Sequence, residues 1–574
     1  MAWPMYAKQK MNAAALTEEL GVAVRVKNGG NKAEVVERNE IQRLIRRVMV
    51  EEGMGHLIPM LELGKRLISH HGFEVTIFVV TVDSPTTHSQ IVQQASNPKS
   101  TGLNVVVLPP VDVSSRLGAL NSQLGTRIRF TMDESLPLLR SAILSMKVLP
   151  IALIVDMFGT NAFTMARDLK MLRFVFFTSS AWVLALHVNI PIIHKEQLDR
   201  HVKHHEPLQI PGCKPVKFED TMEPLLLKDE PMVFEGFMKM CTNTADADGI
   251  LVNTWQELEP TTLKALLSGE AIRGKIYPVG PLVRGINSNR TEKDHDLVLS
   301  WLDRQPAESV IFVSFGSGGT MSEAQMEEIA YGLELGQQRF IWVVRPPHKE
   351  KNHGSYFRLE YGENNRDSVL EKFLSRTHEL GLVVPMWAPQ SEILEHSSVG
   401  AFLTHCGWNS TFEAITNGVP MIAWPLYAEQ KMNAAALTEE MGVAVRVKTG
   451  GNKAEVVKRE EIQRLIRRVM VEEEGVCMRE RVKKLQRSAK MALSEAGSSF
   501  DSIYQLANYC KFHIAVTGPL HAGYLDAKKE KRKMMDVPLS SPARLVFSLW
   551  FALSSYSPPS SSCLSLRSAA SHRI

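Results

Sequence analysis

The feature that most constrains the fold is an alternation of short apolar runs with amphipathic segments, beginning at Gly53 and ending near Ala507. Runs such as RFVFF and VGAFL are apolar at nearly every position instead of every second one. Strands of this kind are buried on both faces, so the pattern predicts parallel sheets covered by helices. A polar stretch near 280–296 interrupts the alternation. We therefore expect an α/β fold of two doubly wound domains, 53–285 and 286–507, facing each other across a cleft.

The net positive charge of the chain comes from residues outside these two domains. The 574-residue chain carries a formal net charge of +4, of which residues 1–52 contribute +2 and residues 508–574 contribute +6, leaving −4 for the remainder. A slightly acidic core without a Lys/Arg stripe does not fit a nucleic-acid-binding protein. The six cysteines lack CxxC or His-Cys spacing, which argues against a disulfide framework and a structural zinc site and favours a reducing compartment.

The sequence contains no pattern typical of a targeting signal or a membrane span. Its first residues lack the apolar core and cleavage site of a signal peptide. The uncharged stretch Phe174–His194 is long enough to span a bilayer, but it reads as a buried strand, a Thr-Ser-Ser turn and a core helix. The apolar piece Leu545–Leu553 is too short to span. We therefore expect a cytoplasmic protein without an integral membrane segment; the sequence leaves the oligomeric state open.

The first residues are a near-exact copy of a later segment. Residues 2–52 match residues 423–473 at 45 of 51 positions. Solenoid repeats recur many times and diverge, whereas this is a single copy. We interpret 1–52 as the result of a recent duplication or a fused gene, not as a functional module.

The last part of the chain shows no periodicity. After about Ala507 the alternation stops, and the final 35 residues include 12 serines. A Ser-rich, basic composition is typical of disordered segments, so we expect 508–574 to be a disordered tail.

Polar residues that follow the apolar runs are candidates for ligand binding, because ligands bind at the carboxyl ends of strands in open α/β sheets. The segment THCGWNST follows the run VGAFL and opens a helix. There His405, Asn409, Ser410 and free backbone N–H groups would form an anion site. The alternative is that Asn409 or Ser410 is only a helix N-cap and that His405 is a buried turn residue.

A second candidate loop is FGSGGT, Phe315–Thr320, which follows the run SVIFVSF. Gly316, Gly318 and Gly319 would allow the backbone to approach a diphosphate closely. The segment lacks the full GxGxxG spacing, so a simple tight turn is the alternative.

The first half contains a candidate general base. His56 belongs to the segment GMGH, and Asp156 ends the run IALIVD. A histidine oriented by a carboxylate can remove a proton, because the carboxylate stabilises the imidazolium that forms. Spacing alone leaves this pairing open, since the chain contains 18 histidines.

The 44 residues from Trp387 to Gln430 closely resemble the plant secondary product glycosyltransferase box of the UDP-dependent glycosyltransferases, without a gap. The similarity extends over roughly 53–507 and includes GMGHLIP, VDMFG, ADGILVNTWQELEP and FVSFGSGG. The sequence most resembles the branch that glucosylates phenylpropanoids and hydroquinone-type phenols. The resemblance implies a GT-B fold, with the acceptor bound mainly by the first domain and the UDP-sugar mainly by the second.

The resemblance also implies a donor site of three parts, for the nucleoside, the diphosphate and the hexose. In that order, the matching positions are Trp387, Ala388, Gln390 and Glu413; then Ser317, His405, Asn409 and Ser410; then Trp408, Glu429 and Gln430.

The implied reaction is an inverting transfer of glucose from UDP-glucose to a small phenolic acceptor. His56 would take the acceptor proton and Asp156 would steady the imidazole, with no metal or other cofactor. The alternative is a chain that binds the UDP-sugar but is catalytically impaired. An NAD-dependent oxidoreductase does not fit, because the chain lacks a full dinucleotide fingerprint.

The sequence departs from the family pattern just before GMGH. Relatives have an apolar first strand there, whereas this chain has RLIRRVMVEE, Arg43–Glu52. One possibility is that 48–50 form a short strand, with Glu51 and Glu52 near the end of the sheet. The other is that the segment stays helical, so that the first domain loses a central strand and His56 lacks support.

Overall fold

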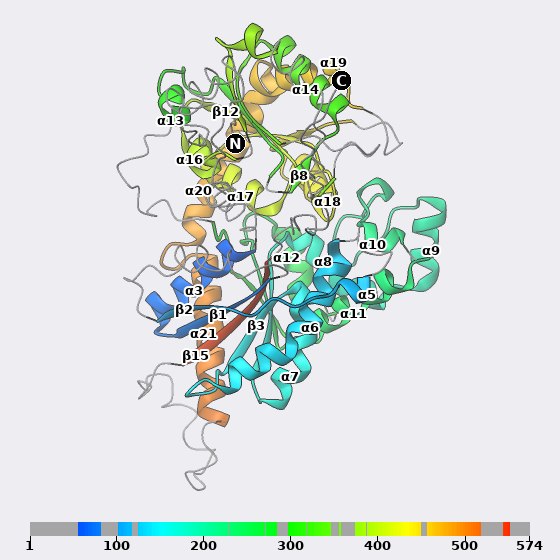
Figure 1. The fold of residues 1–574 in the computed structure, drawn as a ribbon, viewed down its shortest axis with the longest axis vertical. Coiled ribbons are helices and arrows are strands. Elements are labelled where there is room, and N and C mark those ends of the chain that lie inside the picture. Colours follow the sequence, from blue (N-terminus) through cyan, green and yellow to red (C-terminus); the bar gives the residue numbers. More distant parts are fainter. Residues whose placement is uncertain are drawn as a thin grey trace, which may run out of the picture.

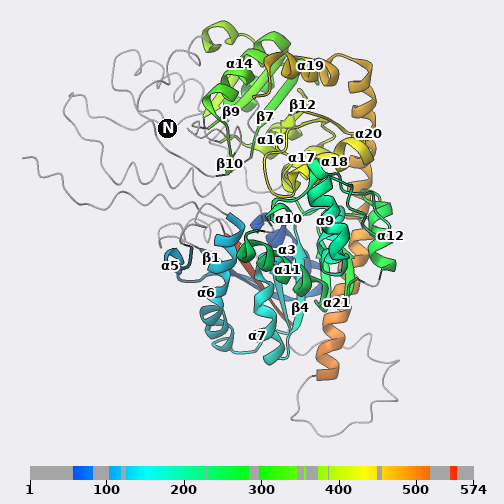
Figure 2. The same ribbon diagram turned by 90° about the vertical axis from the view of Figure 1, so that its right-hand side faces the viewer.

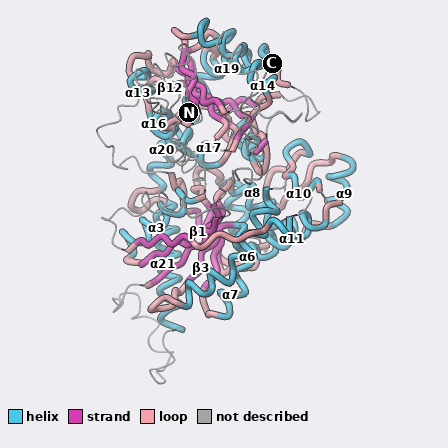
Figure 3. Tube along the Cα trace, viewed as in Figure 1, coloured by secondary structure: helices cyan, strands magenta, loops and turns pink. Residues whose placement is uncertain are grey.

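The computed structural model describes residues 56–81, 102–117, 124–227, 229–269, 271–283, 297–316, 318–345, 355–356, 373–385, 387–448, 456–517 and 543–551. These residues form two α/β domains, each built on a parallel sheet (Figure 1). Figure 3 shows the strands gathered into two separate groups with helices around them. The expectation of two doubly wound domains is confirmed.

The first domain contains a seven-stranded sheet with the order β2-β1-β15-β3-β4-β5-β6, and all neighbouring strands are parallel. Its strands are β1 (Glu74–Thr81), β2 (Leu103–Val107), β3 (Ala152–Asp156), β4 (Leu172–Phe177), β5 (Gly249–Val252), β6 (Lys275–Pro278) and β15 (Arg544–Phe551). Strands β3 to β5 are buried at every position, which explains why their sequences do not alternate.

The strand β15 comes from the segment that we expected to be a disordered tail. That prediction is wrong for 508–517, which belong to the helix α21 (Ser498–Thr517), and for 543–551. Figure 1 shows β15 in red between the blue β1 and the cyan β3. The run RLVFSLWF is too short for a membrane span but long and apolar enough for a buried strand, a property that the Ser-rich surroundings concealed.

The helices of the first domain cover both faces of this sheet. They are α3 (Leu57–His71), α5 (Ser114–Leu117), α6 (Leu124–Leu144), η3 (Met157–Ala162), α7 (Phe163–Asp168), α8 (Ala181–Asn189), η4 (Ile190–Ile192), α9 (Lys195–His204), η5 (Phe218–Asp220), α10 (Glu223–Leu226), α11 (Pro231–Ala245) and α12 (Pro260–Ser268). Successive strand residues face opposite cores: Ile77 and Phe547 share a core with α3 and α21, whereas Phe78 and Val546 share the other with α6 and α8.

The second domain contains a six-stranded parallel sheet with the order β11-β9-β7-β12-β13-β14. Its strands are β7 (Val310–Ser314), β9 (Arg339–Val344), β11 (Gly381–Pro385), β12 (Val399–Thr404), β13 (Met421–Ala423) and β14 (Ala444–Arg446), beside the short antiparallel pair β8 (Gly319–Thr320) and β10 (Ser355–Tyr356). Its helices are α13 (Leu297–Leu302), α14 (Glu323–Gly336), α16 (Gln390–Glu395), α17 (Trp408–Asn417), α18 (Gln430–Ala435), η6 (Ala436–Glu440), α19 (Arg459–Met470) and α20 (Glu473–Ala492).

The chain returns to the first domain after α20. This helix packs on α17 and α19, whereas α21 packs on α3 and β6 of the first domain; Figure 2 shows the two helices following one another along both domains. Ile503, Leu506 and Cys510 of α21 are buried in the core of the first domain. We expected the second domain to extend to residue 507. That boundary is wrong, because α21 buries its apolar stripe against the sheet of the first domain and so belongs to that domain.

The copied segment 1–52, including both possibilities for Arg43–Glu52, lies outside the described residues, as does most of the polar stretch 280–296. No described helix is long and apolar enough to cross a membrane. Within the described ranges, no group of three His, Cys, Asp or Glu side chains is placed to hold a metal ion.

Candidate active site

The structure brings His56 and Asp156 together at the carboxyl end of the first sheet. Nδ1 of His56 lies 3.3 Å from Oδ2 of Asp156. The other carboxylate oxygen, Oδ1, accepts hydrogen bonds from the backbone N–H groups of Phe158 and Gly159, at 3.0 and 3.1 Å. The Asp156 side chain is fully buried, whereas that of His56 is 32% exposed. The carboxylate is thus fixed by the first turn of η3, and the imidazole remains accessible.

The second ring nitrogen of His56 faces a residue that the sequence did not single out. Thr178 Oγ1, directly after β4, lies 3.3 Å from Nε2 of His56. The imidazole also stacks on Phe158, with 6.0 Å between ring centroids. If Asp156 accepts from Nδ1–H, Nε2 is the basic atom of the ring. The sequence signal that could have identified Thr178 is its position directly after an apolar run. The same signal identified Asp156.

Glu429, in the second domain, lies near His56 across the domain boundary. Burial raises the pKa of its carboxyl, and the charge of His56 acts in the opposite direction, so the two side chains lie within electrostatic reach. The neighbouring Gln430 accepts hydrogen bonds through Oε1 from the N–H groups of Leu426 and Tyr427, at 2.9 and 3.1 Å. This amide oxygen therefore fixes the turn that presents Glu429.

The residues predicted to bind the nucleoside form one group at α16 and α17. Gln390 Nε2 donates to Glu413 Oε2 at 2.6 Å and to Ser410 Oγ at 2.9 Å. Ser391, which sequence reasoning missed, donates to Glu413 Oε1 at 2.5 Å. Trp387 is 36% exposed and Ala388 is buried. An indole that remains this exposed in a folded domain is available for stacking on a planar base.

The FGSGG loop and the THCGWNST loop meet around His405. A Cβ at Gly316, whose φ is +72°, would lie 2.6 Å from Nε2 of His405, and a Cβ at Gly407 would also collide with the ring. Glycine is therefore required at 316 by both conformation and space. Ser317 lies outside the described residues.

His405 has the properties of a neutral hydrogen-bond donor. Burial, followed by the charge of Arg345, lowers its pKa to about 4, so the ring is uncharged at neutral pH. Its buried Nδ1 has no hydrogen-bond partner among the described residues. Arg345, directly after β9, acts on His405 through its charge, and sequence reasoning missed it although it too follows an apolar run. A buried cation beside an unsatisfied ring nitrogen suits an anionic ligand.

The proposed capping role of Asn409 or Ser410 is wrong. Helix α17 begins after Gly407, which makes no side-chain capping bond. Ser410 instead accepts from Gln390, as described above. The first turn of α17 therefore presents its N–H groups to the space beside His405 without a capping side chain.

Trp408 is placed differently from a side chain that binds sugar. It is 2% exposed, packs against Phe412, and donates from Nε1 to the backbone oxygen of Asn253 in the first domain at 2.8 Å. The indole therefore fastens the two domains together, and only the backbone of Trp408 is left for a ligand.

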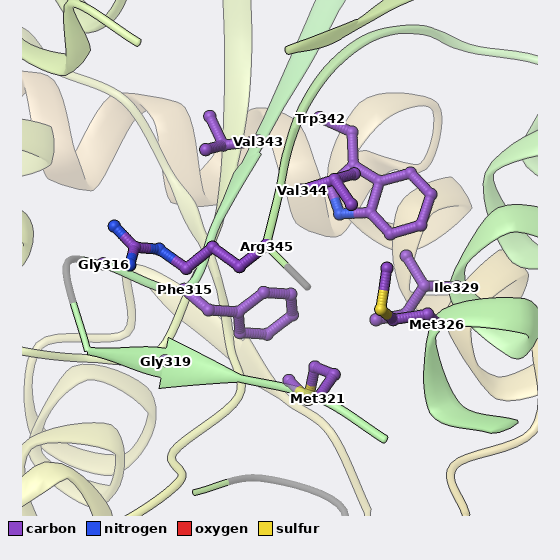
Figure 4. A pocket seen from close by; sticks show the side chains of 10 residues that line it. All are labelled: Phe315, Gly316, Gly319, Met321, Met326, Ile329, Trp342, Val343, Val344 and Arg345. Carbon is purple, nitrogen blue, oxygen red and sulfur yellow. The ribbon is translucent and has the colours of Figure 1, made fainter. Parts of the chain in front are cut away.

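A pocket lies beside the FGSGG loop, lined by Phe315, Met321, Met326, Ile329, Trp342 and Arg345, among others (Figure 4). Its volume is about 20 Å³. A cavity of roughly 10–15 Å³ holds one water molecule, so this pocket is far too small for a nucleotide or a sugar. In Figure 4 the Arg345 side chain extends past Phe315 toward Gly316.

Comparison with known proteins agrees with this geometry. Residues 275–472 match the family described as UDP-glucoronosyl and UDP-glucosyl transferase. UDP-glycosyltransferase 72E3 of Arabidopsis thaliana is 45% identical over 82% of this chain and 97% of its own. Hydroquinone glucosyltransferase of Rauvolfia serpentina is 41% identical over 81% and 97%.

A solved structure matches over the same extent. It is that of Phytolacca americana UGT2 with UDP-2-fluoro-glucose and pterostilbene, which is 36% identical, covers 80% of this chain and 97% of its own, and has a TM-score of 0.68. Two facing Rossmann-like domains, the loops at their strand ends and relatives of this identity over four fifths of the chain lead to one conclusion. The chain belongs to the plant UDP-glycosyltransferase family, has its GT-B fold, and is a UDP-glycosyltransferase.

Proposed function

We propose that this glycosyltransferase moves glucose from UDP-glucose to the hydroxyl group of a small phenolic acceptor, with inversion at the anomeric carbon. The observation that carries the proposal is the pair His56 and Asp156: the carboxylate is fixed on Nδ1, the His56 side chain is 32% exposed, and Glu429 lies within electrostatic reach. This arrangement supports an oriented general base close to the proposed hexose site.

In the proposed reaction, Nε2 of His56 takes the proton of the acceptor hydroxyl. The acceptor oxygen then forms a bond to the anomeric carbon, and the bond from that carbon to the diphosphate breaks, with its electron pair leaving on UDP. Asp156 stabilises the imidazolium that forms, and two backbone N–H groups hold its carboxylate in place beside the ring.

The donor contacts follow the three groups of the site. Trp387 would stack on uracil beside Ala388 and Gln390, and Glu413 would accept the ribose hydroxyls. Hydrogen bonds from Gln390 and Ser391 already orient the Glu413 carboxylate. The hexose would contact the carboxylate of Glu429, the amide nitrogen of Gln430 and the backbone of Trp408.

The leaving diphosphate gains charge as the bond breaks. The N–H groups at the start of α17, the neutral His405 with Asn409 and Ser410, Ser317 and the nearby Arg345 would stabilise this charge. These groups would do what a divalent cation does in other transferases, so we propose that no metal is needed.

A phenolic acceptor is supported by the relatives, since one is a hydroquinone glucosyltransferase and another was solved with pterostilbene. Both names refer to compounds with a phenolic hydroxyl. A phenol also suits a histidine base, because its proton is far more acidic than that of an aliphatic alcohol.

We propose the cytoplasm as the location of the protein, on the cysteine usage alone.

The test is UDP release from UDP-glucose with hydroquinone and with coniferyl alcohol, and the anomeric configuration of the product by NMR. We expect a β-glucoside and loss of turnover in His56→Ala. His378→Ala is the matched control, because that histidine is 69% exposed and lies outside the site.

The competing hypothesis of an impaired protein makes a different prediction. UDP-glucose would bind in calorimetry, but neither acceptor would be glucosylated, and His56→Ala would change nothing. Turnover of aliphatic alcohols but not of phenols would contradict the acceptor class and leave the transferase activity standing.

A further inference from the structure

The first sheet contains a central strand that comes from the far end of the sequence. In a β-α-β unit, a helix that leads into a parallel strand is preceded by a neighbouring strand of the same sheet. Helix α3 leads into β1, and the residues before His56 lie outside the described ranges. The position between β1 and β3 is nevertheless occupied, by β15 from the other end of the sequence.

The pairing of β15 is continuous on both sides. It pairs with β1 from Glu74↔Arg544 to Thr81↔Phe551 and with β3 from Ala152↔Leu545 to Val155↔Ser548. Backbone bonds at its start join Glu74 N to Ala543 O at 2.8 Å and Ile151 N to Arg544 O at 2.9 Å. The strand is therefore integrated into the hydrogen-bonding ladder on both edges.

The side chains of β15 suit a strand that is buried on both faces. Leu545, Val546 and Phe547 are at most 1% exposed. The one charged residue, Arg544, is at the amino end, where it pairs with Glu74 at 2.5 Å. By contrast, Arg43–Glu52, which precedes the GMGH loop, contains three arginines and two glutamates. In the same central place those charges would have to lose water, which makes the C-terminal run the better occupant.

The strand also packs against both elements that carry the catalytic pair. Phe547 packs in one core with Leu57 and Met60 of α3, the helix that starts directly after His56. Val546 packs in the other core with Val155, the residue before Asp156. The residues next to His56 and to Asp156 are thus both packed against β15.

We propose that Arg544–Phe551 is a required part of the acceptor domain, a strand supplied by the C-terminal segment that completes the sheet and positions His56 against Asp156. This inference rests on the proposed catalytic role of the pair, and the strand itself is a positioning element that touches no substrate.

The first test is Phe547→Pro in the full chain, since proline removes a ladder N–H and is not tolerated in a central strand. Ser561→Pro, in the same Ser-rich region but outside β15, is the matched control. We expect faster hydrogen exchange in β1 and β3 but not in β7 and β12 of the other domain. We also expect kcat to fall about a hundredfold, because a shift of about 1 Å between reacting groups has that effect. The affinity for UDP should change less than threefold.

Three outcomes would overturn the inference. One is unchanged exchange and turnover in Phe547→Pro. Another is loss of UDP affinity in the same variant, because the effect would then not be confined to the acceptor domain. The third concerns a variant with a protease site inserted between residues 530 and 531. After cleavage we expect the C-terminal fragment to co-elute with the rest of the protein in gel filtration, and we expect activity to persist. Separation of the fragment with full activity retained would mean that the strand is not required.

A gain-of-stability variant supplies an independent test. The hydroxyl of Ser548 is fully buried in β15 and has no hydrogen-bond partner among the described residues. Ser548→Ala should therefore raise the melting temperature of the acceptor domain by about 2–4 °C if the strand is docked. No change would count against docking. If the unaltered chain shows no glucosyl transfer, the proposed function is wrong, and exchange, gel filtration and melting still decide the role of β15.

Discussion

Trp408 of the second domain donates a hydrogen bond from Nε1 to the backbone oxygen of Asn253 in the first domain, at 2.8 Å and with the indole 2% exposed. A second tryptophan crosses in the other direction, since Nε1 of Trp255 donates to Ser488 Oγ at 3.0 Å. The two domains are therefore joined by directional hydrogen bonds from two buried indoles, which hold the ends of both sheets in a fixed relation.

Trp408→Phe should destabilise the protein. The substitution leaves the Asn253 oxygen buried without its donor, which costs about 1–3 kcal/mol. Thermal unfolding followed by fluorescence measures the loss. Trp387→Phe is the matched control: it should leave stability nearly unchanged, because that indole is 36% exposed, but weaken UDP binding. Equal stability losses in the two variants would contradict the division of roles.

Asp156→Asn should lower kcat by roughly 10²–10⁴ with little change in KM for UDP-glucose, because an amide cannot stabilise the imidazolium. Steady-state kinetics at saturating acceptor gives the split. The control is Asp303→Asn, which alters a histidine–aspartate contact of 3.1 Å with His396 outside the site. If both variants retain full activity, His56 does not depend on a carboxylate.

Arg345→Met should weaken the binding of UDP about tenfold, about 1.4 kcal/mol, and leave the binding of uridine unchanged. The reason is that Arg345 acts on His405, at the part of the site assigned to the diphosphate. Calorimetry with both ligands separates the two effects. Arg376→Met, at an exposed arginine paired with Glu334, is the control. An equal loss of affinity for UDP and for uridine would mean that Arg345 does not act on the diphosphate.

Glu259 should make stability depend on pH. Its carboxyl is fully buried and accepts from Thr254 Oγ1 and from the N–H groups of Ala181 and Trp182. Burial raises its pKa from 4.5 to about 7. Between these values the folded state holds a proton that the unfolded state has released, so the free energy of unfolding should fall by about 3 kcal/mol as the pH rises from 4.5 to 7.

Urea unfolding of the wild type and of Glu259→Gln at pH 5, 6, 7 and 8 measures this slope. The variant should lack it, whereas Glu257→Gln, at an exposed position nearby, should keep it. Parallel curves for all three proteins would mean that Glu259 is ionised throughout.

Several parts of the site could be predicted because their signals are local. Asp156, Thr178 and Arg345 all follow apolar runs, and a parallel sheet brings the ends of its strands to one edge. The rule was applied to Asp156 but not to Thr178 or Arg345. The partner of each residue was not predictable in this way, since His56 and Asp156 are 100 positions apart and their contact depends on how strands order in the sheet.

The sequence by itself determined the two doubly wound domains and the glycine-rich loop at 315–320, because hydrophobic periodicity and the conformational freedom of glycine act over a few residues. Only the tertiary structure decided that RLVFSLWF completes the first sheet, that α21 belongs to the first domain, and that the Trp408 indole joins the domains. A central position in a sheet can be filled by any segment that has unpaired backbone N–H and C=O groups and apolar side chains on both faces, wherever that segment lies in the sequence. That choice depends on contacts between distant residues, which no local pattern in the chain encodes.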